Sequence, residues 1–122
     1  MISFNAIFYD NNNSEIADFN CLTLDIKHLN LKSGETYKLV LIPNFTGSPD
    51  LILSDESVKF ILNDGSCETD TLADITLSDQ QDGYLTYKLT LNSNADFWFN
   101  ISIGELNMAI KIISSQWFFH TW

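Results

Sequence analysis

The sequence predicts an all-β domain, an antiparallel sandwich or barrel, and three observations support this prediction. Apolar and polar residues alternate in several runs, most clearly from Tyr84 to Leu91, which is typical of strands with one face on a core. Turn-forming pairs such as Asp64-Gly65 and Asp82-Gly83 separate the runs. Roughly eight to ten short strands at this spacing favour such an architecture, with little or no helix.

The central region contains the clearest strands and turns. Ser57 to Leu62 is expected to form a strand that ends in the turn Asn63–Ser66, and Leu72 to Leu77 forms the next strand. A second turn over Ser78–Gly83 opens the strand Tyr84–Leu91. The residues of that strand expected to face the core are Leu85, Tyr87, Leu89 and Leu91.

The N-terminal part is expected to begin with a strand from Ile2 to Tyr9, which the Asn-rich turn Asp10–Ser14 ends. The inward residues of this strand are expected to be Ile2, Phe4, Ala6 and Phe8. A further strand is expected from Ile16 to Ile26, and residues 27–34 form a connection. Its expected inward residues are Leu22, Leu24 and Ile26.

The next strand is expected at Glu35–Ile42. Its expected inward residues are Tyr37, Leu39 and Leu41. Pro43 cannot donate a hydrogen bond to a neighbouring strand, so we expect it to end this one. Residues 44–50 have the composition of a loop, and Leu51–Leu53 is expected to be a short edge strand.

The C-terminal part has two more alternating runs after the polar turn Asn92–Asp96. In Phe97–Ile103 the phenylalanine and isoleucine residues are expected to face inward, and Trp98 is expected to face outward. Gly104 ends that run, and Asn107–Ile113 is the next strand. The two places where a single helical turn is expected are Ser93–Asp96 and Gly104–Asn107.

Length and charge restrict the classes of function. The 122 residues are predicted to form one domain, 1–122, with a core that needs no metal or disulfide. Sixteen acidic residues against six lysines give a net charge of −10, which disfavours nucleic-acid binding and docking on anionic membranes. The sequence has no secretory signal and no transmembrane segment, which favours a cytoplasmic or virion location. Cys21 and Cys67 are therefore expected to be free thiols.

The sequence contains few residues that could support catalysis or bind a metal. His28 and His120 are the only histidines, and no nucleophile motif or phosphate loop accompanies them, so no catalytic residue and no enzyme activity is predicted. Several turns contain carboxylates, for example Asp55-Glu56 and Asp79 with Asp82, and such clusters can bind structural calcium. The EF-hand pattern is absent, so we predict no cofactor and no metal ligands.

The exposed aromatic residues are the candidate binding residues. Trp98 is expected on the outward face of its strand. The terminal run 117–122 places aromatic residues on both of its faces, which predicts either a strand buried on both sides or a surface covered by another subunit. The predicted partner-binding residues are Trp98, Trp117, Phe118, Phe119 and Trp122.

The order of motifs resembles the N-terminal domain of phage baseplate upper proteins. Val58-Lys59-Phe60 leads to Asp64-Gly65-Ser66, and the later stretch Asp82–Tyr87 is followed by the aromatic strand Phe97–Ile103. The sequence departs from that family where Ala95-Asp96 replaces a glycine, and it stops at Trp122, before the downstream domains of a baseplate protein. The resemblance implies an immunoglobulin-like sandwich and a component of a virion.

These observations predict a non-enzymatic structural or adaptor protein of a phage tail, baseplate or capsid surface. Its expected partners are other copies of the chain, giving a homo-oligomer, or other virion proteins, and not nucleic acid or membrane. One alternative is a carbohydrate-binding module in which Trp98 or a terminal tryptophan stacks on a sugar. Another is an acidic inhibitor that mimics the charge of DNA.

Overall fold

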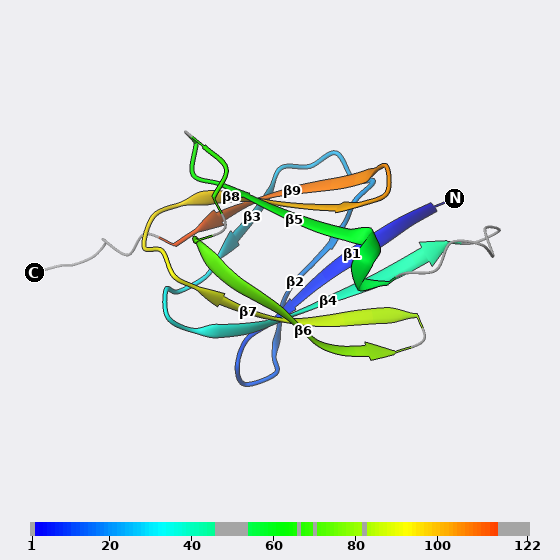
Figure 1. The fold of residues 1–122 in the computed structure, drawn as a ribbon, viewed down its shortest axis with the longest axis horizontal. Helices are drawn as coiled ribbons and strands as arrows, with labels where there is room; N and C mark the ends of the chain where they lie inside the picture. The colour runs from blue at the N-terminus through cyan, green and yellow to red at the C-terminus, as the bar shows by residue number, and fades with distance from the viewer. Residues whose placement is uncertain (1, 46–53, 66, 70, 82, 115–122) are drawn as a thin grey trace, which may run out of the picture.

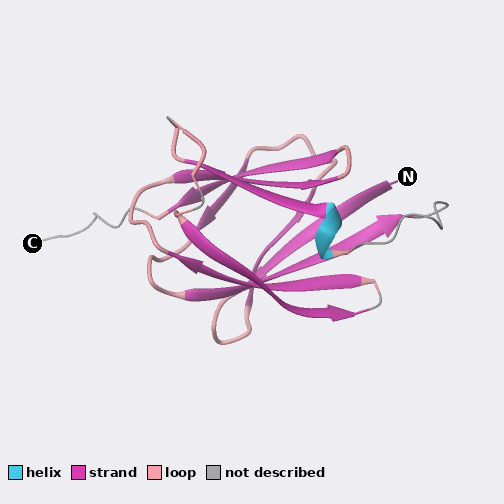
Figure 2. Ribbon diagram, viewed as in Figure 1, coloured by secondary structure: helices cyan, strands magenta, loops and turns pink. Residues whose placement is uncertain are grey.

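The computed structural model describes residues 2–45, 54–65, 67–69, 71–81 and 83–114. Within these residues the chain forms strands in two stacked layers and a single short 3-10 turn (Figures 1 and 2). The elements, in chain order, are β1 (Ile2–Tyr9), β2 (Glu15–Asn20), β3 (Lys27–Asn30), β4 (Thr36–Phe45), η1 (Asp55–Ser57), β5 (Val58–Asn63), β6 (Ala73–Gln81), β7 (Tyr84–Leu91), β8 (Phe97–Ile103) and β9 (Leu106–Ile113).

The two layers are separate sheets. Sheet A has the strand order β2-β1-β4-β7-β6, and sheet B has the order β3-β9-β8-β5. The strands β1, β4, β7 and β6 occupy the places of strands A, B, E and D of an immunoglobulin domain, and β5, β8 and β9 those of C, F and G. The predicted immunoglobulin-like β-sandwich is therefore confirmed. It is not wholly antiparallel, because β3 runs parallel to β9.

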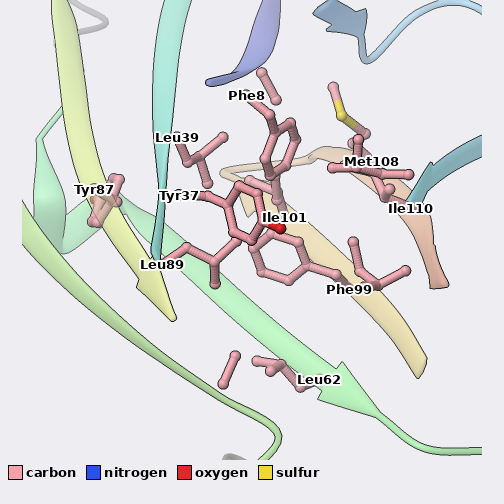
Figure 3. Packing of buried hydrophobic residues seen from close by; sticks show 14 of the residues in the cluster. Phe8, Tyr37, Leu39, Leu62, Tyr87, Leu89, Phe99, Ile101, Met108 and Ile110 are labelled. Carbon is pink, nitrogen blue, oxygen red and sulfur yellow. The ribbon is translucent and has the colours of Figure 1, made fainter. Parts of the chain in front are cut away.

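The core lies between the sheets and is built from the alternating residues of facing strands (Figure 3). Three rings connect the two layers. Phe8 of sheet A meets Phe99 of sheet B edge-on at 6.4 Å between centroids, and Phe60 stacks on Phe99 at 5.5 Å. The inward faces predicted for β1, β4, β7 and β8 are confirmed, since their inward side chains in the described residues are buried.

The prediction of one strand from Ile16 to Ile26 was wrong. β2 ends at Asn20, whose side chain accepts a hydrogen bond from the Leu22 N–H at 2.9 Å. This turn takes the chain from sheet A to sheet B, so the residues predicted to face inward are exposed: Leu22, Leu24 and Ile26. The connection predicted for 27–34 was also wrong in its first part, which forms β3.

Pro43 does not end β4, contrary to the prediction. It lies opposite Phe4 of β1, and both the N–H and the C=O of Phe4 are directed to Cys21, on the far side from β4. The nitrogen of Pro43 therefore faces away from β1. On that side β7 pairs with β4 only as far as Leu41, so no hydrogen bond is lost at the proline.

Two further boundaries differ from the predictions. β6 continues to Gln81, so the turn predicted for Ser78–Gly83 is confined to the tip of the hairpin. The helical turn lies at Asp55–Ser57, and not at either predicted position. The predicted edge strand Leu51–Leu53 lies outside the described residues.

Candidate protein-binding face

The outer face of sheet B is formed by the residues that alternate with the buried ones. We call this surface the sheet B face. Its outward residues are His28 and Asn30 of β3, Asn107, Ala109, Lys111 and Ile113 of β9, Trp98, Asn100 and Ser102 of β8, and Lys59, Ile61 and Asn63 of β5.

The charge of the sheet B face differs from that of the whole chain. None of its outward strand residues is Asp or Glu, whereas Lys59, Lys111 and His28 all lie on it. The complete chain has a net charge of −10. A face whose strands contribute cations and no acidic residue differs in potential from the rest of such a chain, although Glu68, bridged to Asn63, lies at its β5 edge.

Trp98 lies in the middle of this face, on the outward side as predicted. The register places His28, Lys111, Trp98 and Asn63 in one row across the four strands. Trp98 is 37% exposed, and the Lys111 ammonium lies over its ring, 5.2 Å from the centroid. A cation over an indole holds the ring in place and makes a rigid, partly apolar contact point.

The row next to Trp98 contains an unsatisfied polar atom. Asn100 lies between Ile61 of β5 and Ala109 of β9. Its side-chain Oδ1 is buried and has no hydrogen-bond partner among the described residues. A buried amide oxygen without a partner costs about 1–3 kcal/mol, and the directly opposite side chains of Ile61 and Ala109 offer it no donor.

At the β3 edge, the sheet B face continues into three exposed aliphatic residues. Leu22, Leu24 and Ile26, which we call the β3 ridge, precede β3 directly, and Leu24 is 100% and Ile26 74% exposed. The register pairs Lys27 with Ile110, so the ridge lies beside the first half of β9. Three large aliphatic side chains exposed next to one another are unusual on the surface of a monomeric protein.

The β3 ridge is held by polar contacts beneath it. Lys27 is buried, and its ammonium donates to the Thr23 carbonyl at 3.1 Å and approaches the Asp25 carboxylate at 3.5 Å. A hydrogen bond from the Thr23 side chain, helped by Lys27, lowers the pKa of Asp25. The backbone of the ridge is therefore fixed while its apolar side chains point away from the core.

The other predicted binding residues are not brought into this site by the described part of the structure. Trp117, Phe118, Phe119 and Trp122 lie outside the described residues. The β3 ridge was missed because its alternation was assigned to a strand facing the core. Asp25 and Lys27 alternate with the apolar residues as they would in a half-buried strand, so the sequence held no signal against that assignment.

Several other features of the described chain bear on function. Both cysteines are free, as predicted. Among the described residues, no group of three or more His, Cys, Asp or Glu side chains is arranged to bind a metal ion. The described part of the chain also contains no helix with the length and apolar character needed to cross a membrane.

Comparison with known proteins supports the fold alone. No protein-family model and no curated protein matches the sequence. Among solved structures, domains 4 and 5 of the S-layer protein SbsC superpose with a TM-score of 0.52 at 8% identity, covering 91% of this chain and 77% of that one. The Lin-41 filamin domain superposes with a TM-score of 0.47 at 10% sequence identity, covering 75% of this chain and 87% of that one. The M1 domain of titin superposes with a TM-score of 0.33 at 14% sequence identity, covering 71% of this chain and 84% of that one.

The fold and its surface thus define a class: an immunoglobulin-like sandwich with one broad outer face free of acidic strand residues. The S-layer domains share the sandwich architecture with it.

Proposed function

We propose that this chain is a non-enzymatic structural domain that binds a protein partner through the sheet B face. The observation that carries the proposal is that the strands of this face contribute two lysines, a histidine and no acidic residue, on a chain whose net charge is −10; Glu68, which is bridged to Asn63, lies at the β5 edge. An exposed tryptophan on a face whose strands contribute no acidic residue agrees with the composition of protein interfaces, in which aromatic residues are enriched and acidic residues depleted. The partner surface that complements it is acidic.

A second copy of the chain is such a partner. Acidic residues lie in the turns and on the outer face of sheet A, where Asp74 and Asp79 are exposed. A contact between the sheet B face of one copy and an acidic surface of the next joins two different surfaces. Heterologous contacts of this kind build rings or extended assemblies. We therefore assign the chain to an assembled particle.

The particle we propose is a phage virion, in its tail, baseplate or capsid surface. The support is the resemblance of Val58-Lys59-Phe60, Asp64-Gly65-Ser66 and the later motifs to phage baseplate upper proteins. These segments include β5 and β7, which belong to different sheets. The aromatic residues of 117–122 remain part of the proposed contact surface.

A carbohydrate-binding module is the second candidate, because Trp98 is exposed on the sheet B face. Sugar stacking needs an open ring face, and Lys111 lies over the Trp98 ring. A sugar on that side of the ring has to displace the lysine. We therefore rank protein binding first.

The native mass of the full chain, measured by light scattering over micromolar concentrations and at low and high salt, tests the proposal. We expect an oligomer that weakens as salt rises, because exposed charges are screened. Trp98→Ala and Lys111→Glu should each reduce it, because both residues lie in one row across the sheet B face.

Three other outcomes contradict parts of the proposal. An oligomer that survives both substitutions on the sheet B face means that another surface makes the contact. A monomer under all conditions means that a second copy is not the partner. Binding to a glycan array that disappears in Trp98→Ala favours the carbohydrate module instead.

A further inference from the structure

The opposite side of the sandwich contains a hollow with a different chemistry. It lies on the outer face of sheet A and has a volume of about 270 Å³. The residues around it that matter here are Asp10, Asn13, Thr36, Lys38, Ser78 and Lys88. The hollow contains no residue of the sheet B face.

Two lysines face each other across the floor of this hollow. Lys38 of β4 lies directly opposite Lys88 of β7 in the strand register. Like charges opposite each other in a sheet destabilise it. The chain has only six lysines and a net charge of −10, so a general excess of lysine does not explain why two of them lie side by side.

The two ammonium groups have different surroundings. The Lys38 ammonium is drawn toward the first hairpin, donates to Asn13 Oδ1 at 2.6 Å and lies 4.5 Å from the centroid of the Tyr9 ring. Lys88 is exposed, and it makes no hydrogen bond or ion pair with any residue that the structure describes. One cation of the pair is fixed, and the other remains available.

Hydroxyl groups lie at two sides of the hollow. Thr36 Oγ1 lies 3.0 Å from Thr90 Oγ1, and only one of these two hydroxyls donates to the other, so one hydrogen is left to donate elsewhere. Ser78 is the extra residue where the register between β6 and β7 shifts. Bulges of this kind often accompany functional sites, because they redirect a side chain.

Asp10 is the one acidic residue at the rim of the hollow among the residues that the structure describes. Its Oδ1 accepts hydrogen bonds from the backbone N–H groups of Asn12 and Ser14, at 2.9 and 3.0 Å. These two donors offset part of its negative charge. The remaining charge still opposes an anion in the hollow, which limits the affinity of the site.

We propose that the hollow binds an anionic oxygen group, a phosphate or a carboxylate, on a small molecule. Lys88 is the main charged donor, Lys38 is the second, and the hydroxyl of Thr36 or Thr90 donates a hydrogen bond. Bound oxygen anions relieve the repulsion between the two lysines, which gives the unusual pair a physical reason. The volume is near the lower end of the range for small-molecule sites.

The test is a titration of the full chain, followed by amide NMR, with sodium phosphate and separately with sodium acetate. Sodium chloride at equal ionic strength is the control for screening. We expect saturable shifts at Thr36, Lys38 and Lys88 with at least one of the two anions. A preference for phosphate or for acetate identifies which group the site takes.

Four variants sharpen this test. Lys88→Gln should weaken binding about tenfold or more, and Lys88→Arg should retain it, because it keeps the charged donor. Asp10→Asn should strengthen binding, since it removes the opposing charge. Lys32→Gln makes the same charge change at an exposed lysine outside the hollow and the sheet B face, and it should leave binding unchanged.

Two results overturn the proposal. The first is shifts with phosphate and acetate that are no larger than those with chloride. The second is binding by Lys88→Gln, with the spectrum elsewhere unchanged, that equals binding by the natural chain. The unchanged spectrum shows that the variant is folded, so neither result can be attributed to loss of structure.

Discussion

The hydroxyl of Tyr87 donates a hydrogen bond of 2.8 Å to the carboxylate of Asp55, two residues that are far apart in the sequence. Tyr87 belongs to β7 of sheet A, and Asp55 begins η1, which leads directly into β5 of sheet B. The bond therefore joins the two layers at the entrance to β5. The Tyr87 ring also meets Phe60 of β5 edge-on, with 4.9 Å between centroids.

Tyr87→Phe removes this bond and keeps the ring. We expect the free energy of unfolding to fall by about 1–2 kcal/mol, because the folded chain loses a hydrogen bond to a charged acceptor, while the exposed Asp55 is then hydrated by water. Urea unfolding measures the change. Tyr84→Phe is the matched control on the same strand, and an equal effect in both variants would contradict the role given to the bond.

The same tyrosine predicts a loss of stability at high pH. Burial and the neighbouring Asp55 raise the pKa of the Tyr87 phenol above its ordinary value. The raised pKa contributes fully to the free energy of unfolding at pH values below the unfolded pKa of about 10. This stabilisation is lost as the pH rises above that value, because the unfolded chain then releases the phenol proton and the folded chain keeps it. Unfolding measured from pH 8 to pH 11 should show a shallower decline for Tyr87→Phe. Burial also raises the pKa of Tyr37, so a smaller decline remains.

Lys27 should be needed for the shape of the β3 ridge. Lys27→Met keeps the buried stem but loses the bond to the Thr23 carbonyl. We expect a loss of about 1 kcal/mol in unfolding free energy, and faster amide hydrogen exchange in residues 22–26 than elsewhere. Lys32→Met is the control, because Lys32 is exposed. Unaltered exchange in 22–26 would show that Lys27 does not hold the ridge.

The aliphatic residues of the ridge should be dispensable for folding. The double substitution of Leu24→Ser and Ile26→Ser should change the unfolding free energy by no more than about 0.5 kcal/mol for each residue, because neither side chain packs on the core. A larger loss, measured by thermal or urea unfolding, would mean that these residues are covered in solution. The same variant can be compared with the natural chain in the native-mass experiment.

Phe99 should be among the most sensitive positions in the core. It contacts Phe8 of the opposite sheet and Phe60 of the adjacent strand. Phe99→Ala is expected to cost about 3–5 kcal/mol, because it leaves a cavity between the layers. Trp98→Ala, one residue earlier on the exposed side, should cost much less. Comparable losses in the two variants would contradict the assigned faces.

The strands that the sequence predicted best are those with one buried and one solvated face. β1, β7 and β8 begin and end where they were expected, because their neighbours on both sides impose the alternation. β3 was missed since it has only four residues and begins with a buried lysine. The second half of β6 was missed because its exposed polar residues resemble a turn.

The candidate site could be predicted only in part. The outward position of Trp98 followed from the alternation in its own strand. That the sheet B face lacks acidic residues could not be seen, because it depends on which four strands lie side by side. Likewise, the alternation of Leu22, Leu24 and Ile26 indicates one apolar side and does not say whether another element covers it. The pairing of Lys38 with Lys88 also required the register.

The parallel pairing of β3 with β9 has a consequence for how the domain is made. β3 is synthesised early, yet its partner strand follows roughly eighty residues later, so closing this loop is a late and entropically costly step. Sandwiches dominated by such distant pairings fold in about milliseconds to seconds. On the ribosome, sheet B stays incomplete until β9 has emerged from the exit tunnel. Among the described strands, the last one made is the one that secures β3.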